Sequence, residues 1–220
     1  AATLPASVAW YAVAYGGGVF VATASGTATA AYSADGITWS SSTLPSSGNW
    51  YGLAYGNGRF VAVRDSSAAA AYSTDGVTWN ASTLPTSAKR LTAGFGNGLF
   101  LVPDETGDTL ATSADGATWA SVTLPMATTW RTPITHGGGV FLLLTAGVTG
   151  YLAYSFDAAT WKTVYLGGTS DRISSVYHKG RIIGPLFAGP PGAVPTFAVS
   201  TPSSTHVMLV GPTGYHVRVR

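Results

Sequence analysis

The sequence contains no cysteine, which excludes disulfide bonds and thiolate metal sites. Charge is scarce as well: charged residues are 9% of the 220, and 11 Lys and Arg against nine Asp and Glu leave a net charge of +2. Binding to a phosphate backbone needs a dense basic face, and no run of Lys or Arg occurs. Nucleic acid is therefore not expected as a partner.

Long hydrophobic runs are also missing. The most apolar segment, GGGVFLLLTAGV at 137–148, is far shorter than the ~20 residues that a membrane span requires, so no membrane insertion is expected. The chain begins at Ala1 without an initiator Met or a signal-like pattern, which indicates a piece of a longer protein. Its histidines lack the close spacing of metal ligands, so neither a metal nor a cofactor is predicted. They are His136, His178, His206 and His216.

The sequence does contain many glycines and prolines, and it has an internal repeat. The 28 Gly and 12 Pro are typical of many short strands joined by tight turns. The motif YGGGVF returns as YGNGRF, FGNGLF, HGGGVF and, in degenerate form, YHKGRI. The last residues of these motifs follow one another by 40, 40, 41 and 41 positions: Phe20, Phe60, Phe100, Phe141 and Ile182. This period predicts repeats over approximately 7–46, 47–86, 87–126, 127–167 and 168–210.

Each repeat contains four short apolar runs, which in the first are WYAVAY, VFVATA, ATAAYS and TWSSSTL. The glycines between the first two runs and the Asp-Gly between the last two are turn chemistry, so each repeat reads as a four-stranded antiparallel meander. A sheet repeated at this period is typical of a β-propeller blade. We expect an all-β fold and a single β-propeller domain over 1–220, with five blades, or alternatively six. Residues 211–220 would close the ring, add a strand or dock elsewhere.

A heptapeptide recurs in the same phase as SADGITW (33–39), STDGVTW (73–79), SADGATW (113–119) and SFDAATW (155–161). It closely resembles the Asp-box, or bacterial neuraminidase repeat, S-x-D-G-x-T-W. The resemblance implies a structural hairpin turn in the outer part of a blade, in a family that includes sialidases, other glycosidases, lectin-like modules and phage tail proteins. A catalytic residue has no reason to recur in every repeat, so we predict a structural role for the box residues. They are Asp35, Trp39, Asp75, Trp79, Asp115, Trp119, Asp157 and Trp161.

Catalysis is not expected from the remaining acids, which are Asp65, Asp104, Glu105, Asp108 and Asp171. A glycosidase needs two carboxylates that face each other across a bond. A sialidase resemblance would also require an arginine triad and a Tyr–Glu pair, and the single Glu has no Tyr in an obvious partner position. We therefore predict no catalytic residue, with a glycan hydrolase based on the 103–109 loop as an alternative.

A meander places the second turn of each repeat and the connections between repeats at the same end of the sheets. These turns differ from repeat to repeat, and variable loops on a rigid scaffold usually carry binding. Counting ten residues back from each hairpin motif gives an expected ligand-binding ring with one adjacent tryptophan: Trp10, Trp50, Arg90, Arg131, Arg172 and Trp130. Aromatic rings beside guanidinium groups suit a sugar with an anionic substituent. The alternative is that these residues pack the blades and pair with Asp171 or with loop acids.

These patterns favour a non-catalytic module that binds a carbohydrate or another receptor, as the distal receptor-binding domain of a phage tail fibre or a similar surface protein. The chain is rich in Ala, Ser, Thr and Gly, lacks Cys and has little charge. The expected partner is a cell-surface glycan or another host receptor, at an extracellular or virion-surface location. Alternatives are the glycan hydrolase and a structural or oligomerisation domain, and a homo-oligomer formed through the parent fibre is left open.

Overall fold

The computed structural model describes residues 2–130, 134–145 and 151–165 in full, and the backbone of five later strands within 176–219. The chain divides into two compact units, Ala1–Thr123 and Leu124–Arg220. Secondary structure in the described ranges consists of strands joined by turns. Among these residues, no helix has the length and apolar character needed to cross a membrane.

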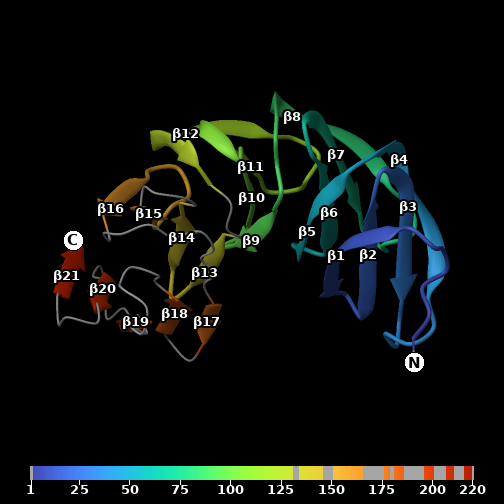
Figure 1. Ribbon diagram of the computed structural model, residues 1–220, viewed down its shortest axis with the longest axis horizontal. Coiled ribbons are helices and arrows are strands. Elements are labelled where there is room, and N and C mark those ends of the chain that lie inside the picture. Colours follow the sequence, from blue (N-terminus) through green and yellow to red (C-terminus); the bar gives the residue numbers. More distant parts are fainter. Residues whose placement is uncertain are drawn as a thin grey trace, which may run out of the picture. The chain divides into compact units, whose positions relative to one another are not determined.

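Three four-stranded antiparallel sheets begin within the first unit (Figure 1), and in each the strands are neighbours in chain order. The first sheet contains β1 (Ala9–Gly16), β2 (Val19–Ser25), β3 (Thr27–Ser33) and β4 (Ser40–Gly48). The second contains β5 (Trp50–Gly56), β6 (Arg59–Arg64), β7 (Ser67–Ser73) and β8 (Asn80–Ala88). The third contains β9 (Gly94–Gly96), β10 (Leu99–Pro103), β11 (Thr106–Ser113) and β12 (Ala120–Thr129), and β12 crosses the boundary between the units.

The second unit contains two more sheets of the same kind. One holds β13 (Thr135–Gly137), β14 (Val140–Leu144), β15 (Tyr151–Ser155) and β16 (Lys162–Tyr165). The other has five strands: β17 (Val176–His178), β18 (Arg181–Pro185), β19 (Thr196–Ser200), β20 (Val207–Val210) and β21 (His216–Val219). Of the three roles considered for residues 211–220, the structure shows an added strand, because β21 pairs with β20.

The predicted four-stranded antiparallel meander is confirmed for four of the five sheets, and the last sheet has a fifth strand. The hairpins form where the sequence supplies residues that accept a positive φ. Asn57 and Gly58 have φ values of 47° and 73° between β5 and β6, which is the conformation of the tight hairpin turn that Asn-Gly favours. The backbone conformation of this turn follows from its own residues, which is why the sequence predicts it well, and Asn57 Nδ2 also donates to the carbonyls of Gly98 and Ala114.

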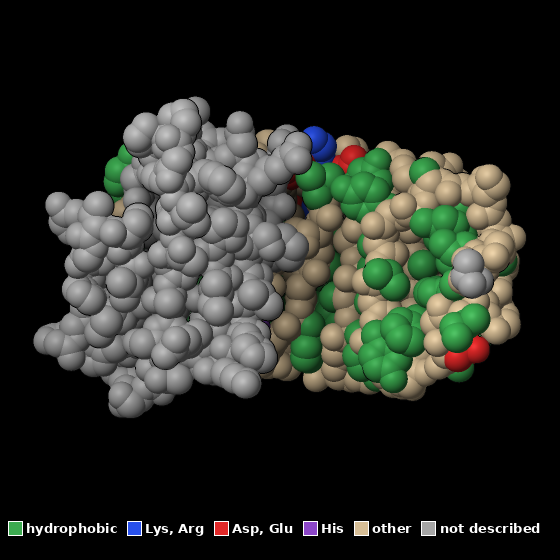
Figure 2. All heavy atoms as spheres, turned by 60° about the horizontal axis from the view of Figure 1, so that its bottom comes forward, with side chains coloured by type: hydrophobic (Ala, Val, Ile, Leu, Met, Phe, Trp, Pro, Cys, Tyr) green, Lys and Arg blue, Asp and Glu red, His purple; other side chains and the backbone are tan. Residues whose placement is uncertain are grey.

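In the first unit, glycines on the first strands of two sheets let the next sheet approach closely. In the first unit β1 contacts β5, and β5 contacts β9. A Cβ atom added to Gly16 would lie inside the ring of Tyr55, and one added to Gly56 would lie inside the ring of Phe95. Each glycine is therefore covered by an aromatic ring of the following sheet. Some hydrophobic side chains of this unit, among them Val13, Tyr15 and Ile37, are exposed, and Figure 2 shows separate hydrophobic patches on the face that it presents.

Candidate functional site

The heptapeptide turns share one hydrogen-bond pattern. Asp35 Oδ1 accepts hydrogen bonds from the backbone N–H groups of Ile37 (2.7 Å) and Thr38 (2.7 Å) and from Ser33 Oγ (2.9 Å). Ser33 Oγ in turn accepts one from the N–H of Gly36 at 2.9 Å. The same bonds recur around Asp75, Asp115 and Asp157. One carboxylate oxygen thus holds the turn closed in all four copies.

The turns also connect neighbouring sheets within the first unit. Ser42 Oγ donates a hydrogen bond to the Gly76 carbonyl (3.2 Å), and Ser82 Oγ donates one to the Gly116 carbonyl (2.8 Å). The indole N–H of Trp119 donates to that same Gly116 carbonyl at 3.1 Å. Each of these two turns is therefore held by its own carboxylate and by a serine of the preceding sheet.

The turn carboxylates should make stability depend on acid pH. Backbone N–H bonds from Thr38 and Ile37 lower the pKa of Asp35 to about 2, and those from Thr160 and Ala159 do the same for Asp157. Since an unfolded Asp titrates near ~4, the stabilising effect is complete above that pH and is lost as the pH falls towards 2. We expect the thermal midpoint of the parent to fall over this interval. The thermal midpoint of the double variant Asp35→Asn, Asp157→Asn should fall less over the same pH interval.

Circular dichroism melts at stepwise pH would measure this difference. Asp108→Asn removes an exposed acid that lies outside the turns and serves as the matched control, with the parent profile expected. If the double variant and the parent lost stability in parallel between pH 4 and 2, the turn carboxylates would not be the groups that titrate.

Three described members of the expected ligand-binding ring are buried, which fits the alternative that these residues pack the blades and pair with loop acids. Trp50 and Arg90 have 0% exposure, and Trp130 is also buried. Trp10 is partly buried, and its indole N–H donates to the Ala6 carbonyl at 3.1 Å. Side chains without accessible surface cannot stack on a sugar or bind its anionic group. Arg131 and Arg172 lie outside the described residues.

Arg90 takes the structural place that Trp50 has one repeat earlier. The indole N–H of Trp50 donates to the Ser46 carbonyl at 3.0 Å, and 40 residues later the Arg90 guanidinium donates to Thr86 Oγ1 and, at 2.7 Å, to the Ser67 carbonyl. An ion pair of 2.6 Å joins Arg90 Nη2 to Asp104 Oδ1. Burial lowers the pKa of Arg90 and raises the pKa of Asp104. In each case the opposite charge of the partner counteracts the shift.

The acids of the 103–109 loop belong to the same network. Glu105 is buried and lies 2.7 Å from Lys89 Nζ, and its backbone N–H donates to the Lys89 carbonyl at 2.7 Å. Thr86 Oγ1 donates to Asp104 Oδ2 at 3.1 Å. Asp104 and Glu105 therefore each contact a cationic side chain. In the part of the chain that the structure describes in full, no group of three His, Asp or Glu side chains could hold a metal ion.

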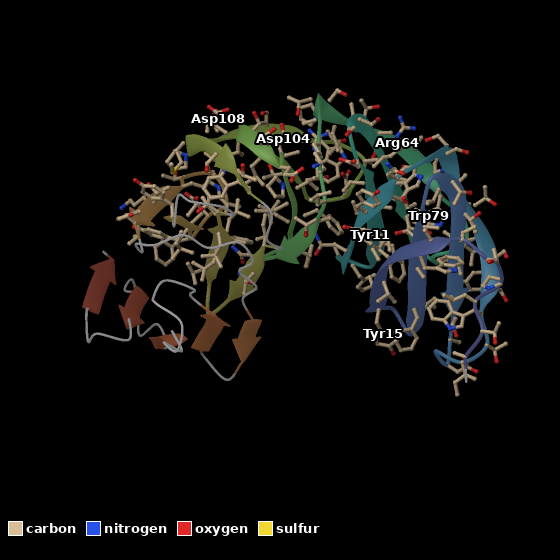
Figure 3. All side chains as sticks on the ribbon, viewed as in Figure 1. Tyr11, Tyr15, Arg64, Trp79, Asp104 and Asp108 are labelled. Carbon is tan, nitrogen blue, oxygen red and sulfur yellow. The ribbon has the colours of Figure 1, made fainter. Side chains whose placement is uncertain are left out.

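Two tyrosines that the sequence interpretation missed form an aromatic pair, in which Tyr11 is exposed and Tyr51 is partly buried. Tyr11 and Tyr51 stack with their ring centroids 4.0 Å apart and an interplanar angle of 30°. Tyr11 is 55% exposed, and it lies on β1 well away from Tyr15 (Figure 3). Both tyrosines follow a tryptophan of the expected ring by one residue. We call Tyr11 and Tyr51 the tyrosine pair.

A backbone irregularity explains the displacement by one residue. The pairing of β1 with β2 goes from Trp10↔Ala24 to Ala12↔Thr23, which leaves Tyr11 as an extra residue in a bulge. The pairing of β5 with β6 skips Tyr51 in the same way. A β-bulge redirects a side chain that simple alternation would place on the other face. The one available signal was the recurrence of Tyr at this position in two repeats.

Neutral polar groups surround the tyrosine pair. Ser25 Oγ lies 3.2 Å from the Tyr51 hydroxyl and donates to Asn49 Oδ1 at 3.1 Å. The N–H of Gly26 donates to the same oxygen at 3.0 Å, and the N–H of Asp65 donates to the Asn49 carbonyl at 2.8 Å. These bonds hold the connection between the first two sheets against the turns at 26 and 65. The pair and this hydrogen-bonded rim lie at the variable loop end of the two sheets.

The sequence also matches a family model described as "DUF6242 beta propeller domain", over residues 2–123. The chain belongs to this DUF6242 beta propeller family. Its four-stranded sheets are accordingly propeller blades, as the repeat period predicts. A search of curated proteins found no significant match.

Solved structures share this propeller fold at low sequence identity. YCF48 bound to D1 peptide is 14% identical with a TM-score of 0.65, and the match covers 98% of this chain and 79% of that one. Virginiamycin B lyase from Staphylococcus aureus with quinupristin is 10% identical with a TM-score of 0.69, covering 96% and 84%. A GH74 enzyme of Niastella koreensis is 16% identical with a TM-score of 0.56, covering 92% and 35%. Likeness at these identities concerns the fold alone, and one fold carries many functions.

Proposed function

We propose that this propeller is a non-catalytic carbohydrate-binding module that holds a sugar ring on the tyrosine pair. The observation that carries the proposal is the stack of the exposed Tyr11 on the partly buried Tyr51, beside an ordered rim of amide and hydroxyl groups. An aromatic ring binds the apolar C–H face of a sugar, while hydroxyl and amide groups exchange hydrogen bonds with its hydroxyls.

The sugar proposed for this site is neutral, whereas the sequence suggested an anionic one. The guanidinium of Arg90, which the sequence interpretation assigned to an anionic substituent, is buried against Asp104. The side chains that hydrogen-bond to the Tyr51 hydroxyl, directly or through Ser25, are instead uncharged: Ser25 and Asn49. A neutral sugar ring fits these groups without leaving a charge unpaired.

The wider biological assignment rests on composition and on the heptapeptide. We assign the four turns to the Asp-box type because they carry the S-x-D-G-x-T-W pattern, which is modified to S-x-D-A-x-T-W at 155–161. Proteins with this box include phage tail proteins, and the low charge and Ala, Ser, Thr and Gly content suit an exposed fibre domain. We therefore propose a receptor-binding domain at the surface of a virion or a bacterium, with a host-surface glycan as its partner.

Tyr11→Ala should weaken binding of the 220-residue chain to its glycan about tenfold, the effect of losing roughly 1.4 kcal/mol of ring contact. The ligand would be found on an array of neutral and anionic glycans, and the affinity measured by titration calorimetry. Tyr15→Ala is the matched control, because it removes the same residue type, 59% exposed, from the same strand. We expect this control to bind like the parent, with no free sugar released in either case.

Three outcomes would contradict the proposal. Tyr11→Ala and Tyr15→Ala could both bind like the parent, the array could select only anionic glycans, or sugar could be released. Release that disappeared in Asp108→Asn would favour the hydrolase alternative.

A further inference from the structure

Arg64, the last residue of β6, has one nitrogen of its guanidinium bound to the first blade and the others open. Its Nη1 donates to the Ser47 carbonyl at 3.0 Å and to Ser46 Oγ at 3.3 Å, and both serines belong to β4. Among the residues that the structure describes, Nε and Nη2 have no acceptor and Arg64 has no ion pair. The side chain is partly exposed. Nε and Nη2 form the forked edge that binds both oxygens of a carboxylate.

The position of this guanidinium is fixed by Gly48. A Cβ atom added to Gly48 would overlap Cδ of Arg64 and would lie 2.9 Å from its Nε. The arginine stem therefore lies directly on the backbone at the end of β4. A side chain that is already held in place loses little conformational freedom when a ligand binds. The open edge of Arg64 is thus positioned in advance.

The third blade shows which group such an arrangement holds. Thr86, forty residues after Ser46, accepts a hydrogen bond from the Arg90 guanidinium and donates one to Asp104 Oδ2 at 3.1 Å. Asp104 stands forty residues after Arg64 and pairs with Arg90. There, a guanidinium and the hydroxyl bound to it together hold a carboxylate of the chain.

The second blade has the same two groups without the carboxylate. Ser46 Oγ accepts from Arg64, and a hydroxyl retains one O–H to donate. The neighbouring acid is engaged with the third blade, because Asp65 Oδ1 accepts the backbone N–H of Arg90 at 3.2 Å. No acid in the described ranges forms an ion pair with Arg64.

A hollow of about 320 Å³ adjoins these groups within the first unit. It lies between the end of β4 and the strands β7 and β8, and Ser46 is among its lining residues. Small side chains make up most of its wall, among them Pro45, Ala68 and Ala69. This volume is at the lower end of the range for ligand sites, which suits a short chain of carbon atoms. Figure 3 shows Arg64 apart from Tyr11, so this place is distinct from the tyrosine pair.

We propose that Arg64, Ser46 and the adjoining hollow form a second binding site, for a carboxylate on a short apolar chain. The carboxylate accepts paired hydrogen bonds from Nε and Nη2 of Arg64 and a further one from the Ser46 hydroxyl. The carbon chain lies in the hollow against Pro45 and Ala68. A free short-chain carboxylic acid and a Glu side chain of a bound peptide both have this chemistry. The inference does not depend on the proposed sugar site.

The test uses two pairs of probes that differ in charge and not in shape. They are butanoate with butanamide, and the end-blocked tripeptide AEA with AQA. NMR titration of the 220-residue chain, followed at the backbone amides of Ser46 and Ala69, would give the dissociation constants. Butanoate should bind weakly but at least about tenfold more tightly than butanamide. Tighter binding of AEA than of butanoate would identify a peptide as the source of the carboxylate, and equal binding would identify a free acid.

Variants of the second blade test the role of the fork. Arg64→Gln should weaken butanoate binding about tenfold or more, because it removes the charged donors. Arg59→Gln is the matched control, since it removes the same residue type from the same strand, and it should bind like the parent. Arg64→Lys keeps the charge without the fork, and Gly48→Ala keeps the arginine but displaces its stem. Both should weaken binding.

Three results would overturn the proposal. Butanoate and butanamide could bind equally, Arg64→Gln and Arg59→Gln could weaken binding equally, or Arg64→Lys and Gly48→Ala could both bind like the parent. The last result would mean that a charge alone attracts the acid. Tyr11→Ala should bind butanoate like the parent, so a failure of this site is distinguishable from a failure of the sugar site.

Discussion

Arg90→Met is expected to lower the free energy of unfolding of the first unit by about 3–5 kcal/mol, because it leaves a buried carboxylate without its cation. Asp104 is 5% exposed, and Arg90 pairs with it at 2.6 Å. The guanidinium also donates to the Ser67 carbonyl at 2.7 Å. Chemical denaturation followed by tryptophan fluorescence would measure the loss.

Two further variants separate the ion pair from general packing. Arg90→Met combined with Asp104→Leu removes both charges and should recover most of the stability. Arg59→Met is a matched single change, since Arg59 is partly exposed, lies 5.4 Å over the Tyr72 ring and donates to the Asp115 carbonyl. We expect it to cost less than about 1 kcal/mol. If Arg90→Met kept full stability and lost glycan binding, the guanidinium would have to face the ligand.

Trp50→Ala is expected to destabilise the first unit by about 3–5 kcal/mol, because it empties a large volume in a packed interior. Trp50 is fully buried and forms a cluster with Ala30, Leu44, Ala62 and Ala71, which belong to both the first and the second blades. Its indole N–H also donates to the Ser46 carbonyl. The loss should appear as a lower thermal midpoint and a lower denaturant midpoint.

Trp10→Ala is the comparison at the equivalent position of the first repeat. Trp10 occupies the equivalent position in the first blade but is only partly buried, so its removal should cost clearly less than that of Trp50. Glycan affinity measured on the folded fraction of Trp50→Ala should match the parent, because this side chain has no accessible surface. An undisturbed fold with lost binding would instead support the ring that the sequence suggested.

The sequence by itself determined the blades. The heptapeptide turns close through hydrogen bonds among residues two or three positions apart, and their recurrence with the glycine hairpins at a period of about 40 residues predicts the four-stranded sheets. Exposure depends on side chains from other repeats, and only the tertiary structure decided it. Tyr11 and Tyr51 stack on each other at bulges of β1 and β5, whereas the count back from each hairpin motif pointed to Trp10 and Trp50. Arg90 became an interior cation because Asp104, which is distant in sequence, lies beside it. Tyr15 and Tyr55 come from equivalent positions, yet only Tyr55 has a neighbouring blade within this unit to pack against.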